Sequence, residues 1–430
     1  MKPIMIFLAV LAVLPSAVEA ANEKWVAVWT GSTHGPYPAG NAVAQPDLRE
    51  ILRDNTANDQ TMRMVVRPGL WTHRVRIRFS NAFGSTPLTI DGAYAGVHGF
   101  GGAVQPGTNR PVHFGGKASV TIAPGELLFS DPVELNYVKR AADLSDRKMA
   151  ISFHIAGNSG PLTWHAKAMS TSYLSAARGG SHGAEESADA LPFTTTSWFI
   201  VDAVEAFAPA DTRVVMGFGD SITDGTNSTI NGDDRWPDFL ANRLRGFPGS
   251  PVVVVNAGIG GNRVIGPEIY DKTKPFSGGP SALDRLDRDV LSLAGINTVI
   301  WLEAINDLGG PKAPAAAVIE GYRKGVERMK KKGIRVIGAT VTSALTATTA
   351  SGTPDADARR KEINEFIRKG GLFDAVTDFD AATVDTQTGA LKPEFQPNSS
   401  IGGAGDKLHP NRAGYQAMAN SIDLKLLFAR

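Results

Sequence analysis

A serine, a histidine and an aspartate in the second half of the chain have the types and spacing of a hydrolytic group. His409 is the one histidine beyond His182, and Asp406 precedes it by three residues, so a single turn of chain can bring the carboxylate to the imidazole. Ser221 follows a short apolar run. A serine hydroxyl attacks a carbonyl only when a base takes its proton, and the usual base is a histidine oriented by a carboxylate. These residues predict a Ser-His-Asp triad for acyl transfer.

The pattern Asp-x-x-His alone is more often a surface turn that caps a helix, so the triad depends on further blocks. Three apolar runs each end in polar residues or glycines: 214–218 before 219–225, 252–255 before 256–263, and 298–302 before 303–307. The functional loops of a parallel sheet lie at the carboxyl ends of its strands. These blocks would therefore bring Ser221, a glycine turn and Asn306 to one rim. A nucleophile, an unobstructed backbone N–H and a side-chain amide are the groups that acyl transfer requires.

The elements that must position these residues change in character near residue 202, in a chain of 430 residues that is long enough for two domains. Before it, alternating runs such as 75–79 predict strands of a β-sandwich, with one face in a core and one in solvent. After it, strand runs alternate with helical ones such as 315–331, which predicts a parallel sheet wrapped by helices. We predict a signal peptide at 1–20, a β-rich accessory domain at 21–205 and an α/β hydrolase domain at 206–430.

The strand-end blocks resemble those of the SGNH, or GDSL, hydrolase superfamily. The four matching stretches are Gly219-Asp220-Ser221, Asn256-x-Gly258-x-x-Gly261, Ala304-x-Asn306-Asp307 and Asp406-x-x-His409. The resemblance extends from about Arg213 to the C-terminus. It implies an α/β fold with a flavodoxin-like parallel sheet sandwiched by helices, here preceded by the β-sandwich-like domain. It also implies that Ser221 is the nucleophile, and that the Ser221 N–H, the Gly261 N–H and the Asn306 amide form an oxyanion hole.

Other residues of these blocks carry expectations of their own. Ala304 stands where the family has glycine, and a positive φ there would cost about 1 kcal/mol or more. Asp220 is expected to brace its loop by hydrogen bonds rather than bind a metal, and Asp307 is a supporting residue of the third block. Arg263 either contacts substrate or pairs with a carboxylate, and the sequence favours neither. Within the triad, the charge of Asp406 is expected to raise the pKa of its histidine.

The N-terminal half offers two further expectations. The stretch 31–38 is too rigid and aromatic for a linker, so we expect it to pack against the α/β domain. His34, within this stretch, is the alternative base if His409 does not serve. Five aromatic residues either stack on sugars or belong to the core: Trp25, Trp29, Tyr37, Trp71 and Trp164.

The N-terminus predicts export. Lys2 precedes the apolar run 4–14, which is too short to span a bilayer, and Pro15 and small residues up to Ala20 follow. We therefore expect a mature chain from about Ala21 in the periplasm or outside the cell, with no later membrane span. The chain has no cysteine, which excludes disulfides, thiolate metal sites and a cysteine nucleophile. A formal net charge of +1 gives no reason to expect nucleic acid as a partner.

The expected activity is that of an exported serine esterase that hydrolyses short acyl esters, acetyl foremost, on a carbohydrate. Its partner would be a small ester or an acylated polysaccharide, and no metal or organic cofactor is expected. The alternatives are an O-acetyltransferase with the same triad, a lipase or broad arylesterase, and a non-catalytic carbohydrate-binding protein. A dinucleotide site is not predicted, because Ile222 stands where G-x-G-x-x-G requires its last glycine.

Overall fold

The computed structural model describes residues 22–41, 48–245 and 248–428. The predicted signal peptide at 1–20, with its cleavage before Ala21, lies outside these residues. Among the helices of the described ranges, none combines the length and the apolar character that a membrane span requires.

The N-terminal half forms two antiparallel sheets that pack face to face. The first has the order β1-β14-β3-β7, with β8 beside β3, and the second has the order β12-β11-β2-β9-β4-β5, with β6 beside β4. The strands of the first are β1 (Glu23–Thr30), β3 (Arg74–Ser80), β7 (Leu127–Phe129), β8 (Val133–Glu134) and β14 (Val201–Pro209). Those of the second are β2 (Thr56–Val66), β4 (Leu88–Val97), β5 (Arg110–Val112), β6 (Ser119–Ile122), β9 (Met149–Pro161), β11 (Ser172–Leu174) and β12 (Phe193–Thr195). The rings of Phe79 and Phe153 meet between the sheets, 5.8 Å apart. The pair β10 (Trp164–His165) and β13 (Trp198–Phe199) stands beside them.

The alternation of apolar and polar residues in β3 was expected to place its polar side chains in solvent, but the structure buries one of them. Its apolar side chains enter the sandwich core, but Arg78 is 2% exposed rather than in solvent. Its guanidinium donates to Asp202 at 2.6 Å, and to the carbonyl of Arg288 and the hydroxyl of Ser292 in the C-terminal half. The polar face of this strand is therefore partly covered by the second half of the chain.

The C-terminal half is a parallel sheet with the order β16-β15-β17-β18-β19. In chain order this is 2-1-3-4-5, the flavodoxin-like arrangement. The strands are β15 (Arg213–Gly219), β16 (Val252–Gly258), β17 (Ile296–Leu302), β18 (Arg335–Ala339) and β19 (Ala375–Thr377). The α-helices are α1 (Ser221–Asp224), α2 (Trp236–Leu244), α3 (Ala282–Leu286), α4 (Ile305–Leu308), α5 (Ala315–Lys331), α6 (Pro354–Lys369), α7 (Phe379–Thr383) and α8 (Arg412–Ser421).

Short 3₁₀ or π segments occur in both halves. They are Arg53–Asn55, Ala141–Leu144, Asp287–Leu291, Ala350–Gly352, Pro393–Phe395 and Leu424–Leu427.

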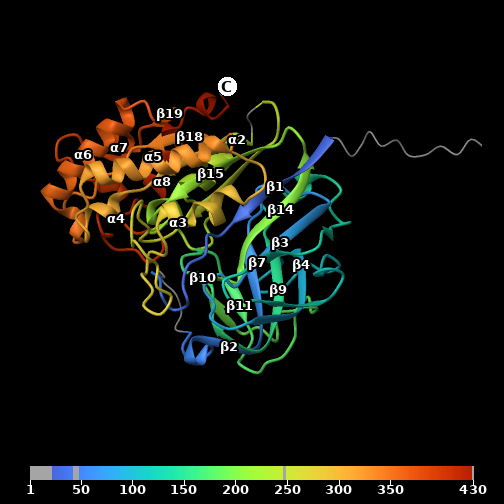
Figure 1. The fold of residues 1–430 in the computed structure, drawn as a ribbon. Helices are drawn as coiled ribbons and strands as arrows, with labels where there is room; N and C mark the ends of the chain where they lie inside the picture. The colour runs from blue at the N-terminus through green and yellow to red at the C-terminus, as the bar shows by residue number, and fades with distance from the viewer. Residues whose placement is uncertain (1–21, 42–47, 246–247, 429–430) are drawn as a thin grey trace, which may run out of the picture.

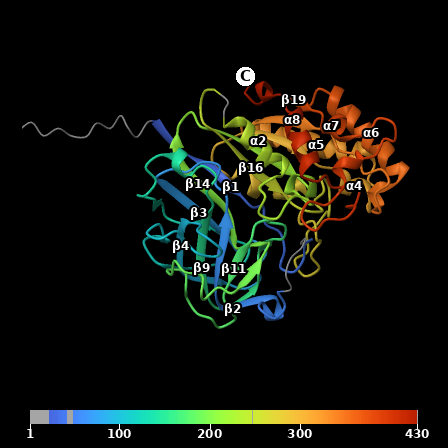
Figure 2. The same cartoon turned by 180° about the vertical axis from the view of Figure 1, so that it is seen from behind.

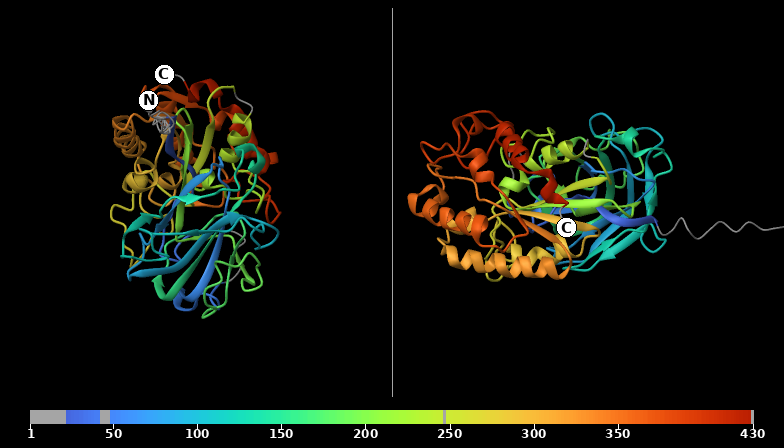
Figure 3. Two further views of the ribbon diagram at one scale, coloured as in Figure 1. Left: turned by 90° about the vertical axis from the view of Figure 1, so that its right-hand side faces the viewer. Right: turned by 90° about the horizontal axis from the view of Figure 1, so that it is seen from above.

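Helices cover both faces of the parallel sheet. With the strands seen between them, α3 and α5 lie on one side and α2 and α8 on the other (Figure 3). The apolar runs of β15 and β17 are buried, as Val214 and Ile300 show, whereas the run of β16 is buried on one face only, because Val252 and Val254 are partly exposed. The expected helix at 315–331 is α5 over those same residues.

The two halves pack against each other over a broad contact. Figure 1 shows the antiparallel sheets beside and below the α/β part, and Figure 2 shows the same arrangement from behind. The Ala27 N–H donates to the carbonyl of Ala294, and the Thr30 hydroxyl to that of Asn256 at 2.7 Å. Strand β14 ends at Pro209, so the predicted division between residues 205 and 206 falls within it.

Candidate active site

Ser221, His409 and Asp406 form one hydrogen-bonded chain at the carboxyl end of the parallel sheet. His409 Nε2 lies 2.7 Å from Ser221 Oγ, and His409 Nδ1 lies 2.5 Å from Asp406 Oδ2. When Nδ1–H donates to the carboxylate, Nε2 is left as an acceptor for the serine hydroxyl. This is the arrangement in which histidine can take the serine proton.

The strand order places the serine between the two expected oxyanion blocks. Strand β15 lies between β16 and β17, so the turns that follow the three strands are neighbours at one rim. Ser221 is the first residue of α1, and Asp220 caps this short helix by accepting the Ile222 N–H at 3.0 Å. Asp220 thus braces the serine turn, as its position suggested. Gly258 permits the close approach of this turn, because a Cβ there would lie 2.2 Å from the backbone nitrogen of Asp224.

The loop before α8 fixes the carboxylate and the imidazole together. Asp406 Oδ1 accepts the backbone N–H groups of Leu408 at 3.0 Å and His409 at 2.8 Å, which leaves Oδ2 for the ring. Asn227, from the loop after α1, donates to the carbonyl of His409 at 3.3 Å. The three-residue spacing in the sequence therefore corresponds to a turn closed by the aspartate itself.

The pKa of His409 is lowered, which differs from the expectation based on Asp406 alone. Burial is the largest cause and disfavours the charged ring, whereas the hydrogen bond and charge of Asp406 raise the pKa and only partly compensate. The charge of Lys167 lowers the pKa further. Although burial opposes it, the hydrogen bond from His409 holds the pKa of Asp406 well below its usual range. The base is therefore neutral, and its partner ionised, at neutral pH.

The expected oxyanion donors lie on the segments that follow the neighbouring strands β15, β16 and β17. Asn306 Nδ2 donates one hydrogen to the carbonyl of Asn262 at 2.9 Å, and its second hydrogen has no acceptor in the described residues. Within the same ranges, the N–H groups of Ser221 and Gly261 also have none. Gly261 has a φ of 84°, a conformation that suits glycine and exposes its N–H. These three groups can together receive a developing negative charge.

Replacing Asn306 by alanine should lower kcat by about 10²–10³-fold with little change in KM, because its amide acts mainly on the charge that develops in the transition state. Steady-state kinetics on a soluble ester measures both constants. Asn364→Ala is a matched control, since this buried amide holds the backbone of Val341 instead, and it should lower the melting temperature without a selective loss of kcat. A loss confined to KM in Asn306→Ala would mean that the amide only binds substrate.

Asp307 holds the loop that follows the second block, whereas the Arg263 side chain contacts an aromatic ring. Asp307 accepts the backbone N–H groups of Val264 and Ile265, each at 3.0 Å, and burial raises its pKa to about 7. The Arg263 guanidinium lies 4.2 Å from the centre of the Phe276 ring, and in the described part of the chain it forms no ion pair within 4.0 Å. Of the two interpretations of Arg263, pairing with a carboxylate is not what the structure shows.

Ala304 occupies a strained conformation. Its φ is 113° and its ψ is −22°, and its side chain is fully buried just before α4. Such a backbone conformation costs about 1–3 kcal/mol in a residue other than glycine. The condition under which alanine was expected to be costly is therefore met.

Replacing Ala304 by glycine should destabilise the protein by less than about 1 kcal/mol, and at the upper end of the strain range it should stabilise it by up to about 2 kcal/mol. Relief of about 1–3 kcal/mol of strain opposes the loss of a buried methyl, about 0.8 kcal/mol, and the greater freedom of unfolded glycine, about 0.5–1 kcal/mol. Ala339→Gly, at an equally buried alanine of β18 without a positive φ, has only the two losses and should destabilise by about 1.5 kcal/mol. Urea unfolding of both variants checks this, and equal destabilisation would contradict the strain at Ala304.

The candidate residues of the N-terminal half are mostly buried, so His34 is not placed as a second base and most of the aromatic residues are not placed to stack on a sugar. His34 Nδ1 lies 3.1 Å from the carbonyl of Ala39, His34 Nε2 accepts the Ala166 N–H at 3.3 Å, and burial lowers the pKa of this ring to about 3. Of the five aromatic residues, Trp25 is half-buried against Phe207, and the remainder are core residues at most 7% exposed: Trp29, Tyr37, Trp71 and Trp164. The stretch 31–38 does contact the α/β part, through its Thr33 and Gly35 carbonyls.

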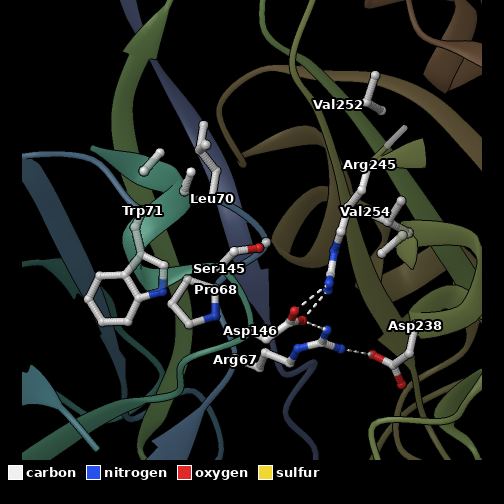
Figure 4. A pocket seen from close by; sticks show the side chains of 14 residues that line it. Arg67, Pro68, Leu70, Trp71, Ser145, Asp146, Asp238, Arg245, Val252 and Val254 are labelled. Atoms are coloured by element: carbon white, nitrogen blue, oxygen red, sulfur yellow. Dashed lines mark hydrogen bonds and ion pairs between the residues drawn. The ribbon is translucent and has the colours of Figure 1, made fainter. Parts of the chain in front are cut away.

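A cavity of about 200 Å³ between the two halves does not include the triad (Figure 4). Arg67 and Arg245 converge there on Asp146, which also keeps the two guanidinium groups together, and Asp238 lies 3.8 Å from Arg67. The charges of this cavity therefore neutralise one another. The described ranges contain no cluster of three or more histidine, aspartate or glutamate side chains placed to hold a metal ion.

The sequence reasoning missed three residues that the structure brings to the triad. Lys167 and His165 come from the N-terminal half, and Asp224 stands at the end of α1. Asp224 Oδ2 accepts the Gly260 N–H at 3.0 Å, while its Oδ1 lies 3.0 Å from His165 Nε2. No motif in the sequence connects residues so far apart, and of the three only Asp224 lies in one of the strand-end stretches, 219–225.

Fold and site together define an α/β domain with a flavodoxin-like sheet and a hydrogen-bonded Ser-His-Asp chain at the carboxyl end of its strands. Residues 218–417, which hold the whole hydrogen-bonded chain, match the model of the GDSL-like Lipase/Acylhydrolase family, so this part of the protein is a GDSL-like lipase/acylhydrolase domain. No curated protein matches the chain.

Solved structures of similar proteins cover about half of the chain. The lipase/acylhydrolase from Enterococcus faecalis is 21% identical over 49% of this chain and 92% of its own, with a TM-score of 0.35. A carbohydrate acetylesterase from Sinorhizobium meliloti is 15% identical over 49% and 95%, with a TM-score of 0.36. The aryl esterase of M. smegmatis is 14% identical over 49% and 95%, with a TM-score of 0.37. At these TM-scores the similarities add nothing to the family match.

Proposed function

We propose that the protein is an exported serine esterase that hydrolyses short acyl esters, acetyl foremost, on a carbohydrate. The observation that carries the proposal is the continuous chain from Ser221 Oγ through His409 to Asp406, beside three donors without acceptors in the described residues. Export rests on the predicted signal peptide, and it would place the enzyme among the acylated polysaccharides of the cell surface.

The reaction follows from the positions of these groups. His409 Nε2 takes the proton of Ser221 as Oγ attacks the ester carbonyl, and the oxyanion receives hydrogen bonds from the N–H groups of Ser221 and Gly261 and from the Asn306 amide. His409 then gives the proton to the leaving alcohol, and an acyl-enzyme remains. Water repeats the sequence and releases the acid.

Two observations support a short acyl group over a lipid substrate. Ser221 is only 3% exposed, so its surroundings admit a small group more readily than a long chain. In the described ranges the strongly exposed large apolar side chains are Phe100, Ile269 and Ile401. These are single residues in separate loops rather than the broad apolar surface that a lipid interface requires.

An activity panel tests the proposal. We expect p-nitrophenyl acetate and propionate to be hydrolysed with a higher kcat/KM than octanoate or longer esters, and acetate to be released from acetylated xylan or peptidoglycan. Preference for long chains would favour a lipase. Transfer of acetyl to an added sugar in place of release as acetate would favour an O-acetyltransferase. No turnover of any ester by the purified full chain would leave the binding-protein alternative.

A further inference from the structure

Lys167 is a buried lysine that reaches from the N-terminal half to the serine turn. It follows β10 in a segment that crosses to the α/β part, and it is 5% exposed. Its ammonium donates to the Thr226 hydroxyl at 2.7 Å. The Thr226 N–H in turn donates to the carbonyl of Ser221 at 3.0 Å. A single residue therefore separates this ammonium from the backbone of the nucleophile.

The stem of the same lysine lies on the oxyanion loop. A Cβ built on Gly260 would stand 2.9 Å from Lys167 Nζ and 3.1 Å from its Cε, so the side chain runs across the Cα of this glycine. Gly260 adjoins Gly261, whose N–H is one of the three oxyanion donors. Lys167 thus touches both loops that must keep their relative position for acyl transfer.

The segment that carries Lys167 is held on both sides. His165, two residues earlier, stands 3.0 Å from Asp224, the residue that accepts the Gly260 N–H. The carbonyl of Ala168 accepts from Arg235, and that of Met169 accepts the Asn231 N–H at 2.8 Å. The position of the lysine is therefore set by several contacts, and a change confined to its head group need not move the segment.

A buried ammonium is costly unless it is paired, and lysine is almost never fully buried without a partner. In the described ranges no carboxylate oxygen lies within 4.0 Å of Lys167 Nζ. The carboxylates that act on it from further away are Asp224, Asp406 and Asp220, and burial lowers the pKa of this lysine. An apolar residue of the same length would pack there at lower cost, so the charge itself calls for a role.

We propose that Lys167 is a positioning residue of the esterase site, which holds the serine turn against the oxyanion loop and sets the charge around His409, so that the N-terminal half supplies part of the catalytic apparatus. The inference rests on the proposed function, because it assumes that Ser221 and His409 perform acyl transfer. It assigns to the strand-rich half a part in the reaction itself.

The pH profile is the readout that separates this role from simple packing. The groups that act on the His409 ring are Asp406 and Asp224, which favour its charged form, and Lys167, which favours the neutral form. His165, Arg235 and Lys167 in turn lower the pKa of Asp224. Removing the lysine charge should raise the pKa of His409, so the acid limb of kcat/KM should move to higher pH, by about 0.5–1 unit.

The test is Lys167→Met, which keeps the stem and removes the charge, measured on p-nitrophenyl acetate from pH 4 to pH 9. We expect kcat to fall by about 10–10²-fold with KM within about threefold, because a misplaced nucleophile affects the chemical step more than binding. Lys167→Gln, which retains a hydrogen-bond donor, serves if the methionine variant does not fold, and should show the same shift of the acid limb.

Lys148→Met is the matched control. Lys148 also comes from the N-terminal half and pairs with Asp233 of the α/β part at 3.1 Å, but its charge is not among those that shift the pKa of His409. It should keep the wild-type profile. If Lys167→Met folds and shows an unchanged acid limb and kcat, Lys167 only joins the two halves and the inference is wrong. Wild-type hydrolysis that does not depend on Ser221 would instead contradict the proposed function, and the two failures are thus distinguishable.

Discussion

Replacing Ser221 by alanine is expected to leave a folded protein whose kcat on a short acyl ester is lower by about 10⁴–10⁶-fold, because the nucleophile itself is lost. Within the described ranges the Ser221 hydroxyl bonds to His409 Nε2 alone, so the fold loses little with it. Binding of the ester should persist, because the oxyanion donors are two backbone N–H groups and the Asn306 amide. The measurement is steady-state hydrolysis together with covalent labelling by a fluorophosphonate.

Ser228→Ala provides the control for this experiment. Ser228 is fully buried seven residues further along, and its hydroxyl has no hydrogen-bond partner in the described part of the chain. Its removal should leave both hydrolysis and labelling at the wild-type level. Fluorophosphonate labelling that persists in Ser221→Ala would show that the nucleophile is another residue.

Replacing Asp406 by asparagine is expected to lower kcat by up to about 10⁴-fold, because an amide next to Nδ1 can stabilise the tautomer in which Nε2 carries the proton. The acid limb of kcat/KM should at the same time move to lower pH. The sign follows from the causes of the pKa shift. Asp406 raises the pKa of His409, while burial and Lys167 lower it, so the pKa of His409 falls further when the charge of Asp406 is removed. A pH–rate profile from pH 4 to pH 9 measures both effects.

A second Asp–His pair in the molecule serves as the control. Asp59 Oδ1 lies 2.9 Å from His154 Nε2 on the second antiparallel sheet, and Asp59→Asn should change neither the rate nor the acid limb.

His409→Ala should abolish the acid limb together with the activity, since both ring nitrogens of His34 are engaged and its pKa is about 3. Substantial activity with a normal acid limb in His409→Ala would mean that another group is the base.

The sequence by itself determined the parallel sheet and the residues at its rim. Short apolar runs that alternate with amphipathic helices leave few arrangements, because parallel strands require helical crossovers on both faces. Since a chemistry-bearing block follows each of β15, β16 and β17, the positions of Ser221, Gly261 and Asn306 could be inferred before any distance was known. The spacing of Asp406 and His409 likewise depends only on a local turn. Each of these features depends on residues that are close together in the sequence, so the sequence pattern predicts it without knowledge of the tertiary packing.

Only the tertiary structure decided how the two halves act on the site. The burial of His409 reverses the pKa shift expected from Asp406, and burial is a property of everything packed around the ring. Ala304 was recognisable as unusual, but its φ of 113° depends on the loop that β17 and α4 impose. Lys167 lies 59 residues from Thr226, with no motif between them, and its ammonium is placed by the docking of one half on the other. Such contacts follow from the packing of surfaces, and no spacing within the sequence encodes them.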